Sequence, residues 1–374
     1  MFMRSRIAVL GLLAAASAAW AQAPDARSSV KINLPPDSPV TLVSADWGES
    51  RATPRGGAMQ LDLHASLQLR NAGPRRVRGV TLLVLAQDVT PGGKASVSAP
   101  SLDVGAAEVF PVRIDLRLLR PLGAGPLVEV GLDGVLFDDL SFYGPDRLNS
   151  RRSMTGWELE ARRDRRHFKS ILEARGAEGL RNEVLSSLAR QSERPRLDVQ
   201  MARAGRATNI EPEREVQFAF LHLPDAPVEP LAGLARVSGN QARAPRIEVR
   251  NRSDRAIRHL EIGWILRDRQ GREFLAGAVP AEVTLEPGGR ARIAPETALR
   301  VSERAGQPVP LDGMTAYVAQ VEFADGKLWI PSRATLADPK LARVAAPSPE
   351  EQRLTELYRK KGLNALVEEL KRFQ

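Results

Sequence analysis

The chain has 374 residues, of which 43% are hydrophobic and 26% are charged, and it contains no cysteine. This composition is typical of globular domains rather than of a disordered chain, and the length allows two or three of them. The lack of cysteine excludes disulfides, thiolate nucleophiles and cysteine-ligated metals.

The charge balance is basic, because 54 Lys and Arg outnumber 45 Asp and Glu and give a formal net charge of +9. A basic protein is attracted to polyanions such as nucleic acid, acidic polysaccharide and anionic lipid. Aromatic residues make up only 5% of the chain, too few for the stacking platforms that bind single-stranded nucleic acid. The composition therefore argues against nucleic acid as the partner.

The N-terminal segment 1–21 has the pattern of a secretory signal peptide. Arg4 and Arg6 precede a short apolar run, 7–19, and Ala19 and Ala21 offer a small-x-small cleavage site. The run is shorter than the roughly 20 apolar residues of a membrane-spanning helix, although an uncleaved anchor is the alternative. We therefore expect a cleaved signal peptide at 1–21, a polar leader at 22–39, and a periplasmic or extracellular protein.

Residues 40–146 have the pattern of a β-sandwich. Leu61–Leu69 alternates strictly between apolar and polar side chains, which is the period of a half-buried strand. Turn-forming residues follow at 71–74, and another apolar strand is expected at 77–86. Short alternating strands separated by Gly and Pro turns indicate a sandwich.

Two segments have helical periodicity instead. In 150–193, apolar residues recur at helical spacing until Gly176 interrupts them, which predicts a pair of helices. In 348–374, Ser348 and Glu351 form a capping box with Pro349 at the first helical position, and Gly362 interrupts the helix.

The chain contains an internal duplication. Leu69-Arg70-Asn71 recurs as Val249-Arg250-Asn251 at an offset of 180, and Gly176 recurs as Gly362 at an offset of 186. Between these blocks, Leu102 with Leu285 and Gly105 with Gly288 suggest an offset of 183. The predicted fold is therefore mainly β with α segments: a sandwich at 40–146 and another at 212–335, each followed by a short helical pair.

The second copy resembles a known family. Asn251-Arg252-Ser253, then Leu266-Arg267-Asp268 with Gly271, then Leu285-Glu286-Pro287-Gly288 are similar to the turns of bacterial extracytoplasmic immunoglobulin-like domains of the FxLYD type. The resemblance is clearest in this block of the second copy and is weaker in the first copy. It implies two tandem immunoglobulin-like domains and an envelope location, and it implies no catalytic residues.

Residues that could carry chemistry are few. The four histidines, His64, His167, His222 and His259, lack metal-ligand spacing, and we expect them at the surface or rim of the fold. Asp139 and Asp325 match between the copies as turn residues. The sequence contains no nucleophile elbow, phosphate-binding loop or zinc motif. It therefore predicts a protein that is not an enzyme and has no cofactor and no metal.

The most distinctive feature is a basic helix at 157–175. Its cations are expected on the side away from Phe168 and could bind an anionic polymer or lipid surface, although a solvated helix face is the alternative. The candidate binding residues are Arg162, Arg163, Arg165, Arg166 and Lys169.

Two functional hypotheses follow. The first is a non-enzymatic exported interaction or scaffolding protein of the bacterial cell envelope, whose partner is another envelope protein. The alternative is a protein that binds an anionic polysaccharide or an anionic membrane surface through the basic helix. The sequence does not determine the oligomeric state.

Overall fold

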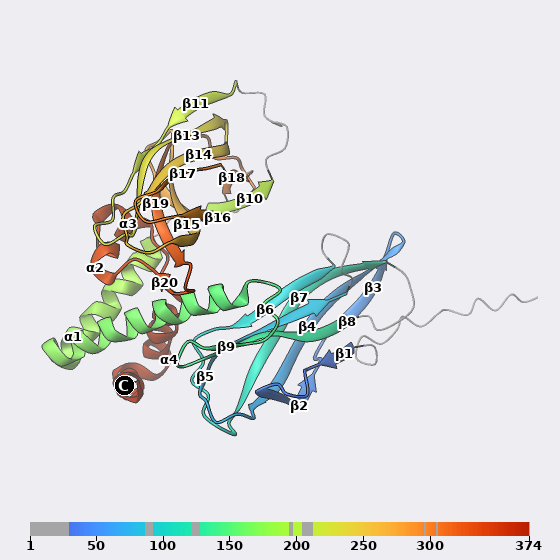
Figure 1. Cartoon of the computed structure of the whole chain (residues 1–374). Helices are drawn as coiled ribbons and strands as arrows, with labels where there is room; N and C mark the ends of the chain where they lie inside the picture. Colours follow the sequence, from blue (N-terminus) through green and yellow to red (C-terminus); the bar gives the residue numbers. More distant parts are fainter. Residues whose placement is uncertain are drawn as a thin grey trace, which may run out of the picture.

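The computed structural model describes residues 30–86, 93–121, 128–193, 197–203, 212–294, 297–303 and 306–373. The signal peptide expected at 1–21 lies outside these residues. The protein is mainly β, with strands gathered in two regions and helices where these regions meet (Figure 1). Among the described residues, no helix has the length and apolar character to cross a membrane.

The first half contains two sheets around one apolar core. One sheet has the order β1-β8-β5-β6 with β9 on β8, and the other has β2-β4-β3 with β7 on β4. Buried side chains from both, such as Leu67 and Leu82, belong to the same cluster. The strands are β1 (Val30–Asn33), β2 (Val40–Asp46), β3 (Arg51–Arg55), β4 (Ala58–Asn71), β5 (Val77–Leu85), β6 (Lys94–Ala99), β7 (Val109–Pro121), β8 (Val128–Phe137) and β9 (Phe142–Tyr143).

The leader expected at 22–39 is not a simple polar linker. Val30–Asn33 forms β1, which pairs in parallel with β8. Val30 and Ile32 alternate with polar residues and pack against the core of the first half. The prediction failed here because two apolar residues in a polar, proline-rich stretch give too weak a period.

The second half also contains two sheets around a separate core. One has the order β12-β19-β15-β16 with β20 on β19, and the other has β10-β18-β14-β13-β11 with β17 on β14. Trp264 lies fully buried in this core. The strands are β10 (Leu197–Arg203), β11 (Arg214–Gln217), β12 (Ala219–Phe220), β13 (Val228–Ser238), β14 (Gln241–Asn251), β15 (Ile257–Asp268), β16 (Glu273–Leu285), β17 (Arg290–Ile293), β18 (Thr297–Glu303), β19 (Leu311–Phe323) and β20 (Leu328–Trp329).

The boundary expected at residue 212 is too late. Strand β10 lies before it and pairs along its whole length with β18 of the second half. The end of the expected helical segment, residue 193, is correct, but nothing in the sequence indicated the strand that begins at Leu197.

One sheet of each half has the same strand order. The sheet β12-β19-β15-β16 repeats β1-β8-β5-β6. β12 pairs in parallel with β19 as β1 does with β8, and the short strands β20 and β9 pair with β19 and β8. Arg75 lies 3.8 Å from the ring centroid of Phe137, and Arg255 lies 3.9 Å from that of Phe323. The duplication inferred from the sequence is therefore visible in pairing and in side-chain contacts.

The buried asparagines Asn71 and Asn251 make the same hydrogen bonds. Asn71 Nδ2 donates to the carbonyls of Arg75, Val104 and Gly105. Asn251 Nδ2 donates to the equivalent carbonyls, those of Arg255, Leu285 and Glu286. These contacts match Val104 with Leu285, so the offset here is 181 and the alignment of Leu102 with Leu285 was wrong.

The two long helices begin and end where the sequence indicates. α1 spans Ser150–Glu193 and has one non-helical residue, Gly176, with φ of 67°. α4 spans Pro349–Arg372 and has its non-helical residue at Gly362, with φ of 82°. Such positive φ angles favour glycine. Two short helices, α2 (Arg333–Leu336) and α3 (Pro339–Val344), precede α4.

The two kinked helices pack against each other and form a shared apolar core. Its buried members come in pairs that keep the offset of 186 between the copies: Phe168 with Leu354, Leu180 with Leu366, and Val184 with Leu370. α1 also contacts β5 and β8 of the first half and β20 of the second. The helices thus connect the two β-rich halves (Figure 1).

Candidate functional site

Four of the five predicted basic residues line one cavity of about 420 Å³, which we call the basic pocket. It lies where α1 meets β5, the turn after β8 and the C-terminal end of α4. The four residues are spaced i, i+3, i+4 and i+7, so they share one face of α1. The lining comprises Arg78, Asp138, Glu158, Arg162, Arg165, Arg166, Lys169, Leu370 and Phe373.

Arg163 does not belong to this group. It faces another side of α1, where its Nε lies 3.0 Å from Asp164 and its Nη1 donates to the carbonyl of Pro331 at 3.1 Å. The expectation that all five cations act on one surface is therefore wrong for Arg163.

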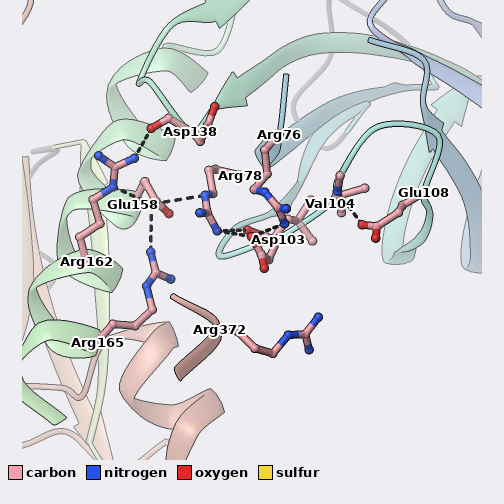
Figure 2. Close-up of polar contacts among 12 residues, drawn as sticks. Arg76, Arg78, Asp103, Val104, Glu108, Asp138, Glu158, Arg162, Arg165 and Arg372 are labelled. Atoms are coloured by element: carbon pink, nitrogen blue, oxygen red, sulfur yellow. Dashed lines mark hydrogen bonds and ion pairs between the residues drawn. The ribbon is translucent and has the colours of Figure 1, made fainter. Parts of the chain in front are cut away.

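Glu158 is the carboxylate on which three arginines of the basic pocket converge. Its side chain is 2% exposed, and its Oε1 accepts hydrogen bonds from Arg162 Nε at 2.8 Å and Arg165 Nη2 at 2.9 Å. Arg78 Nε lies 3.9 Å from the same oxygen (Figure 2). A buried carboxylate is costly unless it is paired, and these guanidinium groups supply the pairing.

The arginines around Glu158 are held from outside as well. Arg78 donates to Asp103 at 2.6 Å (Figure 2). The Arg165 guanidinium lies 4.4 Å from the ring centroid of Phe373, a cation–π contact. Its Nη1 lies 3.4 Å from Glu350 Oε1. The charges are thus fixed in place before any ligand arrives.

The basic pocket has a surplus of positive charge. Its lining has five cationic side chains and two acidic ones, Asp138 and Glu158. Arg166 is exposed and Lys169 is half-buried, with its Nζ 3.4 Å from the carbonyl of Phe373. Arg165, by contrast, is only 6% exposed. The basic residues therefore line a concave site, not the open, solvated helix face that the sequence left as the alternative.

The equivalent region of the second half has lost these charges. At an offset of 186, Ser348, Glu351, Gln352 and Thr355 stand where Arg162, Arg165, Arg166 and Lys169 stand in the first half. Glu158 corresponds to Val344. The copies agree in the core positions of these helices, whereas all four basic positions of the pocket lining differ.

Ser348 and Glu351 line another cavity of about 640 Å³, which we call the second pocket. Arg333 Nη1 donates to Glu351 at 2.9 Å. Burial alone would raise the pKa of Glu351, but the hydrogen bond and charge of Arg333, together with Ser187 and Arg190, outweigh it and hold this pKa below its usual value. Three arginines here face two glutamates, so the surplus of positive charge is smaller than in the basic pocket.

Hydroxyl and imidazole groups in the second pocket have separate partners. Ser187 donates its hydroxyl hydrogen to Glu351 at 2.6 Å, while His167 lies 3.3 Å from Glu183. Among the described residues, no group of three or more His, Asp or Glu has metal-binding geometry.

The other histidines lie apart, and one prediction about them was wrong. His64 is exposed and His222 is exposed as well, as expected. His259 is 1% exposed, and its Nδ1 lies 3.0 Å from Glu282. His259 lies on the side of β15 opposite the core residues Leu260 and Ile262. It is buried there because Arg152 of α1 binds its cross-strand neighbours Glu282 and Glu322.

The matched aspartates are turn residues, as the sequence predicted. Asp139 Oδ1 accepts a hydrogen bond from the backbone N–H of Ser141 at 2.9 Å. Asp325 Oδ1 accepts one from the backbone N–H of Lys327 at 3.1 Å. Both side chains cap their own turns.

Sequence reasoning missed five residues of the basic pocket: Arg78, Asp138, Glu158, Leu370 and Phe373. Glu158 precedes Arg162 by one helical turn, at the i, i+4 spacing that favours an ion pair. Nothing local marks Arg78 or Phe373, because they reach the site only through the packing of β5 and α4 against α1.

No protein-family model and no curated protein matches the chain. Among solved structures, a β-glucosidase from Kluyveromyces marxianus is 9% identical, with a TM-score of 0.17 over 73% of this chain and 45% of its own. Red sea bream transglutaminase is 12% identical, with a TM-score of 0.13 over 75% of this chain and 31% of its own. The chain thus spans less than half of either protein. Similarities this weak carry no argument.

Proposed function

We propose that the protein is a non-enzymatic interaction protein of the bacterial cell envelope that binds a compact anionic group in the basic pocket. We further propose that each half is an immunoglobulin-like β-sandwich of the FxLYD type. Two facing sheets around one core in each half, together with the motif residues of the second copy, support this fold assignment.

One observation carries the functional proposal. Cations at four positions of one helix face converge on a cavity, and the duplicated half has none of them at the matching positions. The duplication explains why the two halves share residues, because both copies form the same fold. It does not explain a charge cluster that only one half has, so a separate role is the better account.

The proposed ligand is an oxyanion because of the donors that are present. Guanidinium groups match the geometry of phosphate and carboxylate oxygens. The lining has two acids against five cations, so an entering anion would be attracted on balance. The cavity of about 420 Å³ suits one small group rather than a polymer lying along a surface. Such a group would be carried by an anionic polysaccharide, a lipid headgroup or another envelope protein.

The test is calorimetric titration of the full protein with phenyl phosphate, a compact anion with an apolar body. We expect binding that weakens as salt rises from about 0.01 M to about 0.15 M, because screening then shortens from about 30 Å to about 8 Å. Replacing both Arg166 and Lys169 by Gln should weaken binding about tenfold or more, since about 1.4 kcal/mol corresponds to tenfold.

Arg166 and Lys169 are chosen because they do not hold Glu158, so the fold should survive their replacement. Arg181→Gln, an exposed position of the same helix outside the cavity, is the matched control and should bind as the wild type does. Wild-type protein that fails to bind the phosphate ester, or a double variant that binds it equally well, would refute the proposal.

A further inference from the structure

The outer face of one sheet in the second half carries a group of arginines. β14 pairs antiparallel with β13 on one side and with β17 on the other (Figure 1). Ile247 and Val249 of β14 belong to the core, so Arg246 and Arg250, which alternate with them, lie on the opposite face. On β17, Arg290 stands beside Arg250, and Arg292 stands beside Glu248. We call Arg246, Arg250, Arg290 and Arg292 the arginine face.

Most of these arginines have no partner among the described residues. Arg246, Arg250 and Arg292 are exposed, and none of them makes an ion pair or a side-chain hydrogen bond with another described residue. Arg290 Nη1 lies 3.7 Å from Glu248 Oε1. The strands β13, β14 and β17 contain two acids, Glu229 and Glu248. The arginine face therefore has a surplus of positive charge over the acids of its own sheet region.

A hollow with large apolar side chains adjoins the arginine face. Its volume is about 440 Å³, and Arg246, Glu248 and Arg292 form part of its lining. Three further residues of the lining, Phe220, Leu231 and Leu234, are half-buried or exposed, so a side chain that enters the hollow can contact them. Leu231 is 37% exposed and lies at a bulge of β13, a feature that redirects side chains.

The first half lacks this group of arginines. β4 pairs with β7 in the first half as β14 pairs with β17 in the second, and this register gives the matching positions. The first half has Ser66, Arg70, Val109 and Pro111 where the second half has its four arginines. Only Arg250 therefore has a basic counterpart. The shared fold does not require the other three arginines, so a separate role accounts for them better.

We propose that the arginine face and the adjoining hollow form a docking site for an acidic segment of another protein. The carboxylates of the segment bind the arginines, and an aromatic side chain fills the hollow. Guanidinium groups match the geometry of carboxylates, and buried aromatic side chains contribute much of the binding energy at protein interfaces. This surface shares no residue with the basic pocket, so the inference does not rest on anion binding there.

The combination of charge and hollow favours a peptide over other polyanions. Arg290 and Arg292 are two positions apart on one strand, roughly 7 Å, which is also the spacing of side chains on one side of an extended peptide. An anionic polysaccharide has no apolar side chain to fill the hollow. Binding to an anionic membrane uses apolar side chains that enter the bilayer, not a hollow in the protein.

The experiment measures the fluorescence anisotropy of a labelled synthetic peptide in the presence of the full protein. The peptide alternates glutamate with threonine around a central tryptophan, so that the carboxylates and the indole lie on one side when it is extended. We expect binding that weakens as salt rises from about 0.01 M to about 0.15 M. Replacing the glutamates by glutamine, or the tryptophan by glycine, should weaken binding about tenfold or more in each case.

Variants of the protein locate the contact. Arg246→Gln combined with Arg292→Gln should weaken binding of the peptide about tenfold or more. Arg70→Gln combined with Arg113→Gln is the matched control, because both side chains are exposed on the corresponding sheet of the first half and the change in charge is the same. This control should bind the peptide as the wild type does.

Three other results would overturn the inference. The first is a wild type that does not bind the peptide, or an Arg246→Gln, Arg292→Gln variant that binds it equally well. The second is a glycine-containing peptide that binds as tightly as the tryptophan peptide, because the surface would then accept polyanions in general. The third is loss of binding only when Arg166 and Lys169 are replaced by Gln, which would place the peptide in the basic pocket.

Discussion

Asn71 and Asn251 show how single residues define the repeated fold. Each is fully buried, and its side-chain amide donates to three backbone carbonyls. One carbonyl lies in the turn that follows the asparagine, and two lie in a loop that is distant in sequence. No other side chain of this size offers both the donors and an acceptor for the following turn. The sequence marked these positions correctly as turns, but only the structure shows that they fasten a second loop.

Replacing Asn251 by Ala should therefore destabilise the second half by about 3 kcal/mol, because buried carbonyls lose their donor at about 1–3 kcal/mol each. Urea unfolding followed by tryptophan fluorescence measures this, since Trp264 lies in the same core. The exposed Asn182→Ala is the control. An equal midpoint for Asn251→Ala and the wild type would show that the asparagine is not structural.

Residue-scale prediction failed where packing against a distant segment decides exposure. His259 is buried because Arg152 of α1 binds its cross-strand neighbours Glu282 and Glu322, although the alternation of its strand predicts exposure. Arg165 is buried because Phe373, at the far C-terminal end of the chain, covers it. Neither cause is present in the local pattern.

At the scale of elements, the kinked helices were the most predictable part of the chain. Periodicity, the cap at Ser348 and the two glycines gave the bounds of α1 and α4 closely. The packing of α1 on α4 could not be predicted, since any two amphipathic helices would have served equally. It brings Phe373 and Leu370 to the basic pocket, which is why part of its lining was missed.

The N-terminal end of α1 is attached to β19 by an ion-pair cluster. Glu322 is 1% exposed and accepts from Arg151 at 2.9 Å and Arg152 at 2.5 Å, and it also pairs with Arg258. Burial would raise the pKa of Glu322, but the guanidinium groups of Arg258 and Arg152 outweigh it, so the pKa lies below its ordinary value. This carboxylate therefore links helix to sheet only while it is ionised.

The lowered pKa fixes the sign of a pH dependence. Between the folded pKa and the unfolded value of about 4.3, Glu322 binds more protons in the unfolded chain than in the folded one. The stabilisation by the Glu322 ion pairs is therefore fully present above about pH 4.3 and is lost as the pH falls through the folded pKa. Glu322→Gln should be less stable than wild type at pH 7 and should lose less stability between pH 5 and pH 3. Urea midpoints across this range measure it.

Other acids titrate in the same range, so the comparison needs a control at an exposed site. Glu178→Gln, whose side chain is 74% exposed, should keep the slope of the wild type. If Glu322→Gln also keeps that slope, Glu322 does not contribute to the acid sensitivity.

At the scale of the whole molecule, the helices hold the duplicated halves together. Their shared core is built from paired positions of both copies, so neither helix buries its apolar face without the other. The sequence predicted the mainly β class and the helical segments. It could not predict that the helical pairs meet, because the periodicity of a helix does not name its partner.

Leu366→Ala should test this connection. The side chain is fully buried among both helices, and Leu→Ala in such a core costs about 2–5 kcal/mol. We expect faster limited proteolysis within α1 and α4 and a lower thermal midpoint. Leu185→Ala, at a position of α1 that is 45% exposed, is the control and should have little effect.

The central claim is that a compact anionic group binds in the basic pocket. The most direct measurement is a crystal structure of the full protein with phenyl phosphate. The account predicts phosphate density in the basic pocket, in contact with Arg166 and Lys169. Density in the second pocket beside Arg190 and Arg333 instead, with the basic pocket empty, would contradict it.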